Sequence, residues 1–208
     1  MMKKKTEIFS LSLLTQKDKQ YITNALLNGK TAILPTDTVY GLIVFAKRDF
    51  LSFLNAVKNN PNDKPAQILC SKEHAKILAQ PSLSLNIALK FWPGALTAIL
   101  KASTQGKVLS GLESVGLRVP ESILLEELFN MSGGALFASS ANMHNLPTLE
   151  KQNDIIAVFD GKADIIVING DLKRKPSSII DFTVYPPKII RRGTLNAKDL
   201  QIFKTLTA

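Results

Sequence analysis

The sequence has few of the side chains that build disulfides, metal centres or membrane spans. Cys70 is its single cysteine, so no disulfide can form within the chain, and its place after an apolar run predicts a buried, unreactive thiol. The two histidines, His74 and His144, lie far apart without a cysteine cluster, which argues against a structural zinc site. No apolar run approaches the ~18–20 residues that cross a bilayer. The basic N-terminus is followed by Glu7 and charged residues, so we expect a cytoplasmic protein without a signal peptide or membrane contact.

Common phosphate-binding and catalytic signatures are missing as well. Gly106-Lys107 lacks the upstream glycine and the following Ser or Thr of a Walker A loop. The chain contains no Gly-x-Gly-x-x-Gly, no His-Glu-x-x-His and no Gly-x-Ser-x-Gly. A nucleotide, if one is bound, therefore needs a less common kind of site.

The composition is that of a folded, basic protein. Of 208 residues, 45% are hydrophobic, which is enough to form a core, and the formal net charge is +9. A basic surface favours polyanions such as ATP or RNA. The lysines are scattered, however, so general basicity of the source organism's proteins explains the charge equally well.

Strand and helix signals alternate irregularly along the chain. This predicts an α/β fold with a twisted mixed β-sheet and flanking helices, and we expect a single domain over residues 1–208 because no linker or repeat interrupts it. The predicted helices are 17–28, 49–57, 71–78, 84–91, 121–131 and 197–205. The predicted strands are 31–34, 41–46, 66–69, 95–101, 115–119, 136–139, 165–168, 178–181 and 188–191.

Two polar turns follow predicted strands, where α/β proteins often place ligands. The first contains Thr36, Asp37 and Thr38, and the second is Ser139-Ser140-Ala141-Asn142. Their hydroxyls and amides can donate hydrogen bonds to phosphate or carboxylate groups, but the same residues also form ordinary turns. Both interpretations remain open from the residues alone.

Cations occur at three notable places. Arg118 lies in an apolar strand, where its charge needs a partner, either a carboxylate of the protein or one of a ligand. Lys58 and Lys64 flank an Asn- and Pro-rich loop, which either meets phosphate oxygens or is simply solvated. The basic run 173–175 is a weak indication of RNA binding, because such runs are usually solvated.

In this order the motifs resemble those of the YrdC-like family of threonylcarbamoyl-AMP synthases, in its short form without an extra C-terminal domain. The family has Lys-x-Arg where this chain has Lys58-Asn59-Asn60, so either Lys64 replaces the missing cation or activity is reduced. The matching elements are Pro35–Leu42, Trp92–Thr97, Arg118-Val119-Pro120, Ser140-Ala141-Asn142 with Pro147-Thr148, Ser177–Asp181, and Arg191-Arg192-Gly193.

The resemblance implies that L-threonine, bicarbonate and ATP give threonylcarbamoyl-AMP and pyrophosphate. It implies Mg²⁺ bound mainly through the ATP phosphates, a separate transferase that uses the product to modify tRNA, and no protein nucleophile. The threonine site would comprise Thr36, Arg118, Ala138 and Ser177. The ATP site would comprise Lys58, Lys64, Ser114, Ser140, Asn142, Thr148 and Arg191.

Three other functions remain open. The chain is alternatively a diverged paralogue with an altered substrate, for which Asn60 is the main argument, or a non-catalytic module that binds tRNA or double-stranded RNA. The third is a carbamoyl-adenylate enzyme of metallocentre maturation, but such domains usually sit in longer chains with acylphosphatase and zinc modules.

Overall fold

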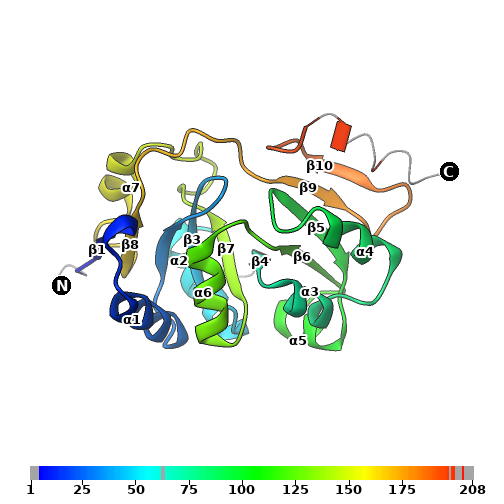
Figure 1. Ribbon diagram of the computed structural model, residues 1–208, viewed down its shortest axis with the longest axis horizontal. Helices are drawn as coiled ribbons and strands as arrows, with labels where there is room; N and C mark the ends of the chain where they lie inside the picture. Colours follow the sequence, from blue (N-terminus) through cyan, green and yellow to red (C-terminus); the bar gives the residue numbers. More distant parts are fainter. Residues whose placement is uncertain (1–4, 62–63, 197, 200–202, 204–208) are drawn as a thin grey trace.

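The computed structural model of the protein describes residues 5–61, 64–196, 198, 199 and 203. They build one ten-stranded mixed sheet with strand order β1-β8-β2-β3-β7-β4-β6-β5-β9-β10, as Figure 1 shows. The strands are β1 (Glu7–Ser10), β2 (Ala32–Pro35), β3 (Tyr40–Phe45), β4 (Gln67–Leu69), β5 (Leu96–Lys101), β6 (Ser114–Arg118), β7 (Leu136–Ser140), β8 (Ile165–Ile168), β9 (Ser178–Asp181) and β10 (Lys188–Arg191).

Seven α-helices of the described part pack on this sheet. Figure 1 shows α1, α2, α6 and α7 around the half that contains β2, β3 and β7, and α3, α4 and α5 around the half that contains β5 and β6. The helices are α1 (Gln16–Leu27), α2 (Leu51–Lys58), α3 (Lys72–Leu78), α4 (Leu83–Lys90), α5 (Thr104–Ser110), α6 (Ile123–Ser132) and α7 (Gln152–Phe159), with short 3₁₀ turns at Leu11–Leu13 and Arg48–Phe50.

The two faces of the sheet carry separate apolar clusters. Side chains alternate along β3, so that Leu42 and Val44 join the larger cluster with α2 and α7, whereas Ile43 joins the smaller one with α1 and α6. Burial of these faces removes apolar surface from water, which is the dominant favourable contribution to folding. The sheet is therefore a rigid, two-sided platform in its centre.

Strand register places the polar site residues on the face of the smaller cluster. Gln67 pairs with Ala138, and Leu69 pairs with both Leu136 and Arg118. Residues opposite one another in adjacent strands point to the same face. Gln67, Leu69, Ala138 and Arg118 thus share the face that α1 and α6 cover only in part.

Most of the predicted elements are confirmed, with ends that differ by one or two residues, and the predicted mixed sheet with flanking helices is correct. The sequence patterns missed β1, α5 and α7. The sequence pattern of α5 is weak because the helix contains Gly106, a poor helix former. The structure needs glycine at this position, since a Cβ would lie 2.1 Å from the carbonyl oxygen of Leu78. The predicted helix 197–205 lies largely outside the described residues. None of the described helices is long and apolar enough to cross a membrane.

Candidate active site

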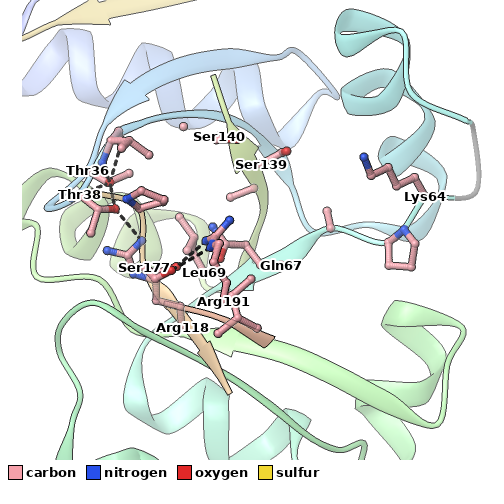
Figure 2. Close-up of a pocket in the computed structure, with 17 residues that line it drawn as sticks. Thr36, Thr38, Lys64, Gln67, Leu69, Arg118, Ser139, Ser140, Ser177 and Arg191 are labelled. Carbon is pink, nitrogen blue, oxygen red and sulfur yellow. Dashed lines mark hydrogen bonds between the residues drawn. The ribbon is translucent and has the colours of Figure 1, made fainter. Parts of the chain in front are cut away.

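A cavity of about 280 Å³ opens on this face of the sheet, where the ends of several strands converge. Figure 2 shows Arg118, Arg191, Ser177 and Gln67 near its centre, Thr36 and Thr38 to one side and Lys64 on the opposite side. The lining residues are Thr36, Thr38, Val39, Gly41, Lys64, Pro65, Ala66, Gln67, Leu69, Arg118, Ala138, Ser139, Ser140, Pro176, Ser177, Ile179 and Arg191.

The turn after β2 is held by its own hydroxyl groups. Thr36 Oγ1 donates to the carbonyl oxygen of Val39 at 2.7 Å and accepts from the amides of Thr38 and Val39 at 3.1 and 3.2 Å. Such a bond pattern is that of a turn shaped by a threonine side chain. The motif therefore forms an ordinary threonine-shaped turn, and the same turn also lines the cavity, where it can meet a ligand.

Arg118 is anchored at the end of β6 by three contacts. Its Nη2 lies 2.6 Å from Asp37 Oδ1, its Nη1 donates to Thr38 Oγ1 at 2.9 Å, and its Nε donates to the carbonyl oxygen of Gly94 at 3.1 Å. The residue is only 2% exposed, and this burial lowers the pKa of the guanidinium, an effect that Asp37 opposes. A protein carboxylate therefore partners Arg118, and two of its five N–H groups remain for a ligand.

Arg191 lies across the cavity at the end of β10. It donates from Nε to the carbonyl oxygen of Ser177 at 3.1 Å and from Nη2 to Ser177 Oγ at 3.2 Å. Burial lowers the pKa of Arg191, and the nearby charge of Arg118 lowers it further. Within the described residues no carboxylate pairs with Arg191, and Asp37 pairs with Arg118 alone, so the charge of Arg191 has no counter-charge in the described part of the chain.

Lys58 lies beneath the cavity wall and does not line it. It is the last residue of α2, is 4% exposed, and donates to Ser139 Oγ at 2.9 Å, to the carbonyl oxygen of Ser140 at 2.5 Å and to Asn142 Oδ1 at 3.1 Å. All three ammonium protons are thus used by the end of β7 and the turn that follows it. Burial, with a smaller contribution from Lys64, lowers the pKa of Lys58 to about 8. Its predicted contact with ATP stays a prediction, and in this structure Lys58 orders the turn.

Lys64 lies at the rim of the cavity, close to the position where the family motif has arginine. Its Nζ is 3.4 Å from Asn60 Oδ1 and 3.3 Å from His144 Nδ1. Asn60 in turn donates to Asn55 Oδ1 at 3.2 Å. No carboxylate of the described chain forms an ion pair with this ammonium, so its charge is available to an anion.

The remaining predicted residues are distributed over the cavity and its surroundings. Ala138 and Ser140 line the cavity, and Asn142 reaches it indirectly by accepting from Ser140 Oγ at 2.5 Å. Ser114 lies in an adjoining, mainly apolar cavity of about 340 Å³ that shares Pro65, Ala66, Gln67 and Ile179 with the first. Thr148 lines neither cavity.

The sequence placed Asp37 and Thr38 in a polar turn without assigning them to either substrate site, and it gave Gln67 no role. The signal for Gln67 was present, since it is a polar residue in a short apolar strand, as Arg118 is in β6. Asp37 gave no comparable signal because nothing in the sequence indicates that it meets a residue 81 positions away. Cys70 is fully buried as predicted, and burial raises the pKa of its thiol to about 12.

Residues 24–193 match the family model of Sua5, YciO and YrdC, described as "Telomere recombination". The chain belongs to the Sua5/YciO/YrdC family. Among curated members, a threonylcarbamoyl-AMP synthase of Pyrococcus abyssi is 31% identical over 180 residues, covering 83% of this chain and 53% of the relative. A threonylcarbamoyl-AMP synthase of Bacillus subtilis is also 31% identical, covering 90% of this chain and 57% of the relative.

Solved structures of the Sua5/YciO/YrdC family share the fold. P. abyssi Sua5 complexed with L-threonine superposes with a TM-score of 0.86 at 28% identity, covering 95% of this chain and 61% of that one. E. coli YciO superposes with a TM-score of 0.83 at 19% identity, covering 93% and 98%, a likeness of fold alone. The chain spans little more than half the length of the two curated relatives, so their activity is a hypothesis for this chain.

Proposed function

We propose that the protein forms threonylcarbamoyl-AMP and pyrophosphate from L-threonine, bicarbonate and ATP. One observation carries the proposal: Arg118, Arg191 and Lys64 line one small cavity together with several hydroxyl groups, and Asp37 is their only nearby carboxylate partner among the described residues. Arg118 is buried, whereas Arg191 and Lys64 are exposed at the rim. Together they give the cavity a positive potential, which favours an anionic ligand. All three substrates carry anionic groups, which fits a site of this charge.

L-threonine would occupy the end of the cavity formed by Arg118, Thr36, Ala138 and Ser177. The two free N–H groups of Arg118 suit a carboxylate, because the guanidinium is planar and presents paired donors. Asp37 and Gly94 fix the plane of that guanidinium before any ligand arrives. The P. abyssi Sua5 complex supports this assignment, since that related protein binds L-threonine.

ATP would extend from the opposite end into the adjoining apolar cavity. Lys64, Ser140 and Arg191 line the first cavity and can meet phosphate oxygens, while Ser114 and the apolar walls of the second cavity suit the nucleoside. Among the described residues no carboxylate lines either cavity, and no cluster of His, Cys, Asp and Glu is fit for a metal ion. Mg²⁺ would therefore enter as part of the Mg·ATP substrate, bound by phosphate oxygens and water.

The chemistry needs positioning and charge stabilisation more than a reactive side chain. The amino nitrogen of threonine bonds to the carbon of bicarbonate and water leaves, which gives a carbamate. A carbamate oxygen then attacks the α-phosphorus, and the bond to pyrophosphate breaks. Arg118 would hold the nucleophile in place, and Lys64 and Arg191 would stabilise the charge that develops on the phosphates.

The proposal is tested by pyrophosphate release from Mg·ATP, with and without L-threonine and bicarbonate. Release that requires both substrates supports it. ATP binding without release would favour a diverged paralogue instead, and RNA binding with steep salt dependence would favour an RNA-binding module. Replacement of Arg118 by Ala should abolish threonine-dependent release while ATP binding partly survives; unchanged threonine affinity in calorimetry would refute the threonine assignment.

Two further parts of the proposal concern the wider pathway. The product is a reactive mixed anhydride, so a separate transferase would have to consume it, with tRNA as the acceptor of the threonylcarbamoyl group. Direct contact of this protein with tRNA or double-stranded RNA rests on the net charge of +9 and on the basic run 173–175. Pull-down of the transferase and salt-dependent RNA titration test these two parts separately.

A further inference from the structure

Gln67 occupies the junction of the two cavities. It begins β4 in register with Ala138 on β7, and it lines both the cavity of Arg118 and the adjoining apolar cavity. A half-buried carboxamide in the middle of a sheet requires hydrogen-bond partners on its oxygen and on its nitrogen. Its partners therefore show what this junction is built to receive.

A chain of hydrogen bonds fixes the direction of the Gln67 carboxamide. Thr97 Oγ1 lies 3.0 Å from Gln67 Oε1 and 2.8 Å from Ser177 Oγ, and Ser177 Oγ is 3.2 Å from Arg191 Nη2. A guanidinium has donors only, so Ser177 accepts from Arg191. Thr97 has one proton, which it donates to Gln67, and Ser177 therefore donates to Thr97. The chain runs one way and ends on the oxygen of Gln67.

The amide nitrogen of Gln67 carries two protons, and the residue lines both cavities. No oxygen of the described residues accepts a hydrogen bond from Gln67 Nε2, whereas Gln67 Oε1 is already engaged. In the reversed orientation Nε2 would point to Thr97 and the carbonyl oxygen would face the cavity, where it could offer no donor to an anionic ligand. The donor pair thus adds to the positive potential of Arg118 and Arg191.

We infer that Gln67 Nε2 donates a hydrogen bond to the one-carbon oxyanion of the reaction, first bicarbonate and then the carbamate oxygen. The inference rests on the proposed function. The one-carbon unit must lie between the threonine nitrogen and the α-phosphorus, which is the junction of the threonine end and the nucleotide end. Gln67 is the donor side chain at this junction, beside Ala138 on one side and linked to Ser177 on the other.

Two variants separate a substrate contact from a structural role. Gln67→Met keeps the length of the side chain without its donors, whereas Gln67→Glu keeps the acceptor for Thr97 and replaces the donors by a carboxylate. In the pyrophosphate assay both variants should raise the KM for bicarbonate by about tenfold or more, because each loses a hydrogen bond to a charged group. The KM for ATP should stay within about twofold of the parent value. Threonine affinity of Gln67→Glu in calorimetry should stay within about threefold. The exposed Gln20→Met on α1 is the matched control and should change none of these values.

An unchanged KM for bicarbonate, or an equal rise for all three substrates, overturns the inference. A second measurement does not depend on turnover: broadening of the ¹³C-bicarbonate resonance by the protein with L-threonine bound. We expect broadening with the parent chain and its loss with Gln67→Glu. If the parent releases no pyrophosphate but shows this pattern, the proposed function fails and the Gln67 contact stands. Broadening that persists in Gln67→Glu, or is absent with the parent, overturns the contact itself.

Discussion

Replacement of Asp37 by Asn should destabilise the protein by leaving Arg118 buried without a counter-charge. The side chains of Arg118 and Asp37 are 3% and 10% exposed, and their closest atoms are 2.6 Å apart. Removing one partner of a buried ion pair costs about 3–5 kcal/mol. Asn retains an oxygen that can accept from Arg118, and Gly94 and Thr38 still bind it, so we expect the lower end, about 3 kcal/mol. For a chain of this size that corresponds to a fall in Tm of ~6–12 °C.

The assay is urea denaturation of the ligand-free protein, followed by circular dichroism, with the change read from the midpoint at constant m-value. Asp49→Asn, at an exposed position that forms no ion pair within the described chain, is the matched control and should change stability by less than about 0.5 kcal/mol. The double variant Asp37→Asn, Arg118→Met removes both charges and should recover much of the loss. A loss below about 1 kcal/mol in Asp37→Asn, or no recovery in the double variant, would refute the ion pair as the support of Arg118.

Three further outcomes are expected. Lys64→Ala should raise the KM for ATP by about tenfold, and the double variant with Asn60→Arg should recover part of that loss of affinity. A KM for Lys64→Ala within twofold of the parent value would show that Lys64 does not replace the family arginine. The pKa of Lys58 is lowered to about 8, so its ammonium is present below that pH and is deprotonated above it. Deprotonation removes one of the donors that order the turn after β7. Threonine-dependent pyrophosphate release should therefore decline as pH rises through about 8, although the threonine amine becomes more nucleophilic over the same range. The Lys58→Arg variant should not show this decline. An identical pH profile in both proteins would contradict the role of Lys58 in ordering the turn. The Cys70 thiol, with its pKa raised to about 12, should resist iodoacetamide in the folded protein and react fully in urea, as mass spectrometry can show.

Much of the fold followed from local patterns. Short apolar runs that end at proline, glycine or polar turns predicted nine of the strands, because alternation and turn chemistry are properties of neighbouring residues. Elements without such signals were missed: β1 is a half-exposed edge strand, and α5 contains a glycine at a close backbone contact. These depend on distant parts of the chain, which a local pattern does not describe.

The candidate site divides in the same way. The sequence by itself determined which polar residues end the strands, that Arg118 needs a partner, and that the motifs occur in the order of one family. Only the tertiary structure decided that Asp37 is this partner and that Lys58 spends its hydrogen bonds on the end of β7 and the turn after it. It also decided that Thr148 lies outside the cavity and that Thr97 and Ser177 orient Gln67. The physical reason is that the hydrogen bonds and ion pairs of the site join residues 30 to 84 positions apart. Their geometry is set by sheet order and packing rather than by neighbours in sequence.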